Sequence, residues 1–131
     1  MAIIAELGRQ GIIPADAMAY VTAAFYILPS LLEVFSPETT FESFGFALSP
    51  LGKLLGGNFG AIKVSAGAFL IVTKLTGKVD LGLAAAAAVG LLNCFKVAAS
   101  ADETGIEKPG IIFWALIQSV IAVLAYKGAI A

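Results

Sequence analysis

The chain has 131 residues, of which 60% are hydrophobic and only 13% are charged. A soluble globular domain has about 25% charged residues, so a soluble chain of this composition could not cover its surface with polar groups. The net charge is −1 and the basic residues are scattered along the chain, which argues against a nucleic-acid-binding protein, because that function needs clustered lysine and arginine.

The chain contains no histidine and a single cysteine, Cys94, which is expected to be a buried packing residue. Histidine is the usual proton shuttle near neutral pH and the commonest metal ligand. Haem iron normally takes a histidine ligand, and a Ser-His-Asp nucleophile needs one. The sequence therefore predicts a protein that is not an enzyme, binds no haem or catalytic metal, and forms no internal disulfide.

Four apolar stretches, separated by polar joints, lie at residues 15–35, 59–75, 81–101 and 110–126. A membrane-spanning helix needs about 20 mostly apolar residues, and each stretch reaches this length when charges near its ends extend to the surface. Short joints force consecutive helices to run antiparallel. We therefore expect an all-α integral membrane protein in which residues 1–131 form one membrane domain, an up-down-up-down bundle of four transmembrane helices.

The chain begins with a segment, residues 1–12, that holds no apolar run long enough for the core of a signal peptide, and we expect an interfacial lead-in. Pro14 fits the start of a helix, where its missing N–H costs nothing. The first span then carries Ala15, Ala19 and Ala23 at four-residue spacing. Such a stripe of small residues lets another helix approach closely.

The joint at 36–58 is the longest and mixes phenylalanine and leucine with charged residues. This mixture predicts segments lying along the membrane surface, although the joint would also suit a loop folded over its own bundle. Ser36 and Pro37 fit the cap and first position of a short interfacial helix. Gly56-Gly57-Asn58 is expected to break the joint just before the second span.

The third span is poor in bulky side chains and carries Gly82, Ala86 and Gly90 at four-residue spacing. This stripe is expected to serve helix packing, either within the bundle or against another subunit. Because the first half of the span is almost bare backbone, something larger should pack against it. Neighbouring spans, another protein, a pigment or a lipid would all meet that need.

Antiparallel topology places Glu33, Lys63 and Lys96 near the same membrane face. Charged groups within a span are costly and mark functional sites when they point inward. Lysine near a helix end, however, usually extends its ammonium group into the lipid headgroups. Three interpretations therefore stand: lysines reaching the surface, a structural ion pair with Glu33, or the polar centre of a carrier or proton relay.

Gln118 lies near the middle of the fourth span. Its carboxamide would form an interhelical hydrogen bond, or its oxygen would bind the magnesium of a chlorophyll, because magnesium prefers oxygen ligands. Asn93 and Glu33 are candidate pigment ligands on the same argument. The basic residues divide equally between the two ends of the bundle, so they do not set its orientation in the membrane.

Three local features resemble the DoxX-like four-helix membrane proteins: Pro37 soon after the first span, Phe59-Gly60-Ala61 at the start of the second, and the tight turn at 77–80. The resemblance covers most of the chain and carries over no set of catalytic residues. It implies a free-standing small membrane protein or a small-solute carrier, in a bacterial or organellar membrane.

The size and the composition, rich in alanine and glycine, also resemble the small accessory subunits of algal and protist photosystem and respiratory complexes. This resemblance implies a non-catalytic subunit that contacts membrane lipids, bridges other membrane subunits and holds chlorophyll, carotenoid or lipid between them. A photosystem–antenna assembly of the plastid thylakoid is the expected setting. A respiratory complex of the mitochondrial inner membrane is the alternative.

Overall fold

The computed structural model describes residues 2–131, which form seven α-helices and no strand. Four of these helices are long and apolar enough to cross a membrane: α2 (Met18–Phe35), α4 (Pro50–Thr76), α5 (Val79–Ala99) and α7 (Lys108–Ile130). The prediction of an all-α chain with four membrane-spanning helices is confirmed.

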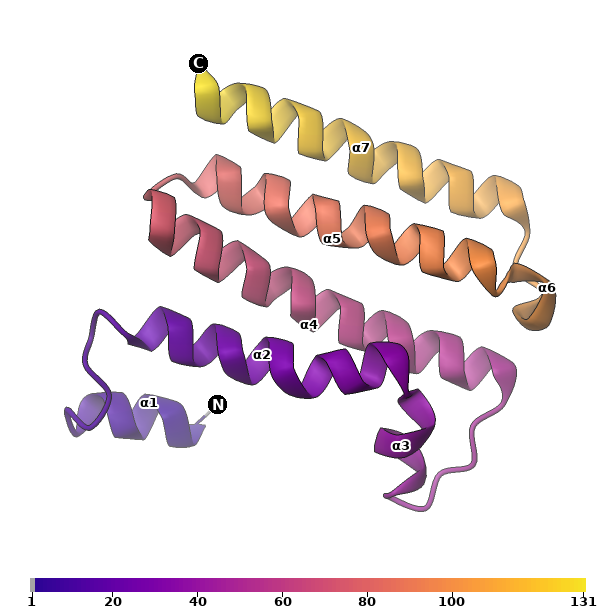
Figure 1. The fold of residues 1–131 in the computed structure, drawn as a ribbon, viewed down its shortest axis with the longest axis horizontal. Coiled ribbons are helices and arrows are strands. Elements are labelled where there is room, and N and C mark those ends of the chain that lie inside the picture. Colours follow the sequence, from indigo (N-terminus) through magenta and orange to yellow (C-terminus); the bar gives the residue numbers. More distant parts are fainter. Residues whose placement is uncertain (1) are drawn as a thin grey trace.

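The four long helices lie side by side in a row, and each runs antiparallel to its neighbour (Figure 1). Extensive interfaces join α2 to α4, α4 to α5, and α5 to α7. The two inner helices, α4 and α5, therefore have a neighbour on each side, while α2 and α7 form the edges. This arrangement is an open bundle whose two broad faces remain uncovered.

The buried core of this open bundle is small. The buried hydrophobic residues among those described are Ile4, Leu54 and Ile111, and the rest are alanines. The accessible surface is 8125 Å², whereas a compact 13.4 kDa monomer should expose about 6,500 Å². Many large apolar side chains lie on the outside, so lipid or other proteins must cover them.

Helices α2 and α4 approach closely because glycines of α4 face α2. A Cβ atom added at Gly60 would lie 2.7 Å from the carbonyl oxygen of Ser30, and one added at Gly67 would lie 3.2 Å from that of Ala23. Ser30 is 1% exposed and Ala23 is 0% exposed at this contact. The glycines thus allow backbone-to-backbone packing of the kind that joins membrane helices.

Helix α4 begins at Pro50, inside the joint that was expected to lie on the membrane surface. Ser49 caps it by accepting a hydrogen bond from the Gly52 N–H at 3.0 Å, and Pro50 occupies the first turn. The expected break at Gly56-Gly57-Asn58 is wrong, since the helix continues through it. Both glycines are buried, so tertiary packing outweighs their low helix propensity.

Other helix ends also differ from the expected spans. Helix α2 begins at Met18, after a turn that contains Ala15. Helix α5 ends at Ala99, and Ala101 starts the short helix α6 (Ala101–Thr104). Helix α7 also includes Lys108 and Lys127, two charged residues that hydropathy alone left outside the expected span.

Besides α6, two short helices lie outside the row. The lead-in forms α1 (Ala2–Arg9), which packs on α2 and buries Ile4, 3% exposed. The expected short helix after the first span is α3 (Pro37–Glu42), which turns away from the row at the end of α2 (Figure 1). An ion pair of 2.9 Å between Glu38 and Lys53 ties α3 to the start of α4.

The contact between α3 and α4 is expected to depend on pH. The Lys53 ammonium bonds to the Glu38 carboxylate and holds the pKa of Glu38 below its ordinary value of 4.5. A depressed pKa means that the contact stabilises the fold above pH 4.5 and weakens as the pH falls through the lowered pKa. The protection of residues 37–48 from hydrogen exchange, taken relative to the intrinsic exchange rate at each pH, should therefore fall only in acid.

The matched control is Glu38→Gln, which removes the charge and should show the same protection on both sides of this pH range. The effect will be small, because both side chains are well exposed to solvent. Equal acid sensitivity in the native chain and in Glu38→Gln would show that the pair does not hold α3.

Candidate functional site

The first polar site of the bundle is an ion pair between α2 and α4. The Lys63 Nζ donates a hydrogen bond to the Glu33 Oε1 at 2.6 Å. Glu33 is 9% exposed, and its second oxygen, Oε2, is buried without a hydrogen-bond partner in the described chain. The structure therefore brings together two of the three charged residues singled out in the sequence.

Lys96 of α5 reaches across α4 toward the end of α2. A Cβ added at Gly57 would lie 3.1 Å from the Lys96 Nζ, 3.7 Å from the Val34 carbonyl oxygen and 4.0 Å from the Glu33 carbonyl oxygen. The missing side chain at Gly57 thus leaves room for the ammonium group. Its positive charge lies near the C-terminal turn of α2, where the helix dipole favours a cation.

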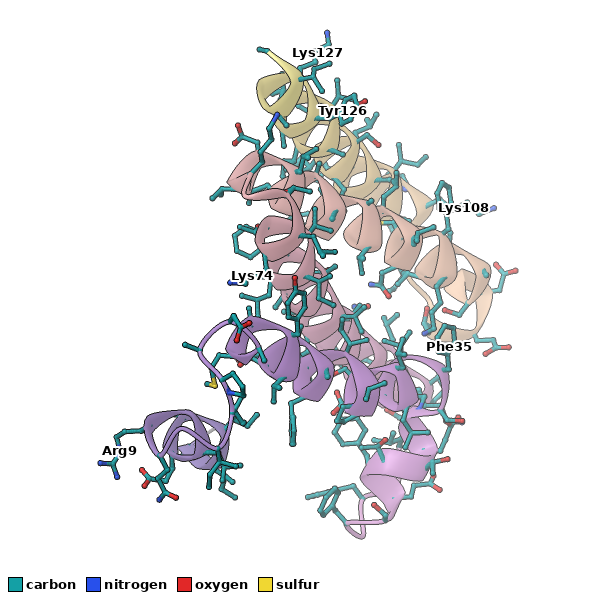
Figure 2. All side chains as sticks on the ribbon, turned by 60° about the vertical axis from the view of Figure 1, so that its left-hand side comes forward. Arg9, Phe35, Lys74, Lys108, Tyr126 and Lys127 are labelled. Atoms are coloured by element: carbon teal, nitrogen blue, oxygen red, sulfur yellow. The ribbon has the colours of Figure 1, made fainter. Side chains whose placement is uncertain are left out.

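The charges at the two ends of the row follow the antiparallel order. In Figure 2, Lys108 lies at one end of α7, and Tyr126 and Lys127 lie at the other. At the end that holds Lys127, the Lys78 Nζ donates to the Ala129 carbonyl oxygen at 2.6 Å and so closes the α5–α7 pair. The opposite end carries most of the acidic residues: Glu33, Glu38, Glu42, Asp102, Glu103 and Glu107.

Helices α4, α5 and α7 together line a cavity of about 810 Å³. Because α5 lies between the other two helices in the row, it contributes the middle of the lining, which includes Ala86, Ala87 and Gly90. Its lining residues carry no charged side chain. The volume falls within the range of about 300–1,000 Å³ that is typical of small-molecule sites.

Three carboxamide side chains line this cavity, one from each helix: Asn58, Asn93 and Gln118. The Asn93 Nδ2 donates to the Asn58 Oδ1 at 2.9 Å, which joins α5 to α4. The Gln118 carboxamide lies against Gly90, where an added Cβ would lie 2.8 Å from Oε1 and 2.9 Å from Nε2. Gly90 therefore makes room for the Gln118 side chain.

The candidate pigment ligands fall in two places. Asn93 and Gln118 line the same cavity, but Glu33 lies between α2 and α4 and is engaged by Lys63. Asn58, which bonds to Asn93, was not singled out in the sequence because it was interpreted as part of a helix break. The sequence signal that could have found it is the spacing of small residues from Gly56 to Gly60, which is typical of a packed membrane helix.

The small-residue stripes are used largely within the chain. Gly82 packs on Phe69 of α4, where an added Cβ would lie 2.9 Å from the Phe69 carbonyl oxygen, and Gly90 packs on Gln118 of α7. Ala86 lines the cavity. On α2, Ala23 contacts α4 and Ala19 is half-buried, whereas Ala15 precedes the helix and cannot belong to its stripe.

Metal binding has no candidate site in residues 2–131, where no three histidine, cysteine, aspartate or glutamate side chains are placed to hold an ion.

Comparison with protein-family models, with curated proteins and with solved structures gives no match. The chemistry of the chain must therefore be inferred from its own geometry.

Proposed function

We propose that this chain is a non-catalytic accessory subunit of a larger membrane complex, in which it bridges neighbouring subunits. The observation that supports this function is the open row, whose inner helix α5 exposes one face to its surroundings. That face carries Ala88, Leu92, Phe95 and Ala99, which follow helical spacing. An inner helix with no cover on this face suits a partner helix.

The physical reason lies in how membrane helices associate. Lipid tails are as apolar as leucine, so helices in a membrane gain little from hydrophobic contact and associate through close packing at small residues. Ala88 and Ala99 let a neighbouring backbone come close, while Leu92 and Phe95 fill the space between. The excess surface of the chain is consistent with such a neighbour.

The proposed mechanism is mechanical. We propose that the row fills a gap between larger subunits and that α1 and α3 contact them. Both short helices project from the edge helix α2 (Figure 1). The specific complex that we propose is a photosystem with its antenna in a plastid thylakoid, on the resemblance of size and composition described above. A respiratory complex of the mitochondrial inner membrane is the alternative assembly.

The free-standing alternative, a DoxX-like protein or a carrier, would use Glu33, Lys63 and Lys96 in transport. In the structure, Lys63 is held by Glu33 at the α2–α4 interface, and neither residue lines the large cavity. No observation favours transport through these residues.

The exposed face of α5 gives the test. Ala88→Trp adds bulk where we propose that a neighbouring helix packs, and it should shift the chain from a large assembly to the free fraction after mild solubilisation. Val120→Trp is the matched control, because residue 120 is exposed on the edge helix α7 and should tolerate the same bulk. Gradient centrifugation with immunodetection measures both.

An Ala88→Trp chain that remains in the large assembly at the native level would remove this face of α5 as the interface. Circular dichroism should show the same helix content in both variants, since neither side chain enters a buried contact. A loss of helix in Ala88→Trp would instead mean that the residue is needed for the fold of the single chain.

A further inference from the structure

The cavity above α5 has a chemical character that the assembly role does not explain. Of the four asparagine and glutamine side chains in the chain, three line it: Asn58, Asn93 and Gln118. The remaining walls are almost entirely apolar, and no lining residue is charged. A ligand of this site should therefore be neutral and mainly apolar, with a small polar group.

The hydrogen-bonding capacity of these side chains is incompletely used. The Asn93 Oδ1 has no hydrogen-bond partner among residues 2–131, but it also has almost no accessible surface, so a ligand in the cavity does not reach it. Gln118 forms no hydrogen bond in the same range, and Asn58 uses only its oxygen. A buried polar group without a partner is costly, and in a membrane no water is at hand to satisfy it.

The unused groups include both acceptors and donors. The Gln118 Oε1, which accepts no hydrogen bond among residues 2–131, requires a donor, and a ketone or an ester cannot provide one. The amide groups of Asn58 and Gln118 have N–H donors to spare, which require an acceptor. A hydroxyl group meets both needs at once, because it donates one hydrogen bond and accepts others.

The polar side chains lie at a similar depth. Counted along their helices at about 1.5 Å per residue, Asn93, Asn58 and Gln118 lie about 9, 12 and 15 Å from the same end of the row. From Val97 to Leu83 the cavity extends along α5 for about 21 Å. Counted from Val97, these side chains lie about 6–12 Å along the cavity, so the hydroxyl would lie near its middle, and the apolar body would extend from it toward Leu83 over the alanines and glycine of α5.

We infer that this cavity binds a neutral, elongated lipid that carries a hydroxyl group, held by Asn58 and Gln118, with Asn93 orienting Asn58, and lying over Ala87 and Gly90. Two sources share this chemistry: a sterol and a hydroxylated carotenoid. The inference does not depend on the accessory-subunit function, because the site is formed by one chain.

The chain contains its own reporters for a test. Its single cysteine, Cys94, and its single tryptophan, Trp114, both line the cavity. Occupancy should slow the alkylation of Cys94 by a membrane-permeant maleimide and change the fluorescence of Trp114. Both signals come from defined positions, so no labelling mutation is needed.

The experiment uses the full chain in phosphatidylcholine nanodiscs with two matched pairs of probes. Dehydroergosterol, a fluorescent sterol with one hydroxyl, is compared with the ketone cholestenone. Zeaxanthin, with a hydroxyl at each end, is compared with β-carotene, which has none. Because one hydrogen bond is worth about 1 kcal/mol, the hydroxylated member of the pair that binds should protect Cys94 with about fivefold higher affinity.

Asn58→Leu and Gln118→Met keep the side-chain volume but remove hydrogen-bonding groups, and each should weaken binding about fivefold. Gln10→Leu is the matched control, since Gln10 bonds to Glu6 outside the cavity and its loss should leave binding unchanged. Protection by the hydroxylated sterol or by the hydroxylated carotenoid supports the inference and identifies which source fits.

The inference is overturned if no probe protects Cys94, or if the hydroxylated and non-hydroxylated members of each pair protect equally. If a variant fails to fold, the probe pairs on the native chain still decide the question. Because the purified chain is tested alone, failure here would leave the accessory-subunit function standing, and loss of that function would leave this site standing.

Discussion

Gly60→Leu is expected to separate α2 from α4 and to lower the free energy of unfolding by about 3 kcal/mol or more. The reason is the backbone contact at this position, where even a Cβ would lie 2.7 Å from the Ser30 carbonyl oxygen. Backbone atoms cannot rotate away as a flexible side chain can. The whole α2 helix, with the buried Glu33 beside the contact, would have to move.

The control for this prediction is Gly110→Leu, because a Cβ added at Gly110 meets no atom within 4 Å. Unfolding in mixed micelles, followed by circular dichroism as the denaturing detergent is increased, measures both variants. Gly110→Leu should unfold like the native chain. If Gly60→Leu unfolds at the same detergent fraction as Gly110→Leu, the α2–α4 packing described above is wrong.

Lys63→Met is expected to lower the free energy of unfolding by about 2 kcal/mol. Removing the lysine leaves the buried Glu33 carboxylate without its counterion, and such a loss typically costs about 3–5 kcal/mol in a fully buried pair. The Lys63 side chain is 37% exposed, so solvent screens part of the interaction and the expected loss is smaller.

A double-mutant cycle separates the lost ion pair from other effects. Glu33→Gln combined with Lys63→Met removes both charges, and the double variant should recover most of the stability lost by Lys63→Met alone. Detergent-induced unfolding of the four proteins gives the coupling free energy. Additive losses would show that Glu33 and Lys63 do not stabilise each other. A loss of solute transport in Lys63→Met that exceeds its loss of stability would favour the carrier instead.

Hydropathy and length were sufficient to predict the four spans and their antiparallel order, and with them the proximity of Glu33 and Lys63. Charged residues are rare in these helices, so the antiparallel order by itself leaves few pairs of charged side chains that can come into contact. The start of α4 was harder to predict. Local propensity predicts a helix break at Gly56, Gly57 and Asn58, but the helix continues because Lys96 and α2 pack against these residues.

The open row and its cavity could not be predicted from the sequence. The long helices are apolar on every side, so their sequences do not specify which face meets a neighbour. A stripe such as Gly82, Ala86 and Gly90 predicts close packing but not its partner, and only the structure places Gln118 against Gly90. The cavity is lined by three separate helices, and no single segment indicates it.

The central claim, that this chain is a subunit of a larger membrane complex, is tested most directly by its size in the native membrane. We would solubilise that membrane with a mild detergent, separate the complexes by gradient centrifugation, and follow the chain together with visible absorbance. Co-migration with a large assembly is the predicted result, and a chlorophyll-bearing assembly would support the photosystem. Migration as a small, colourless species would contradict the claim.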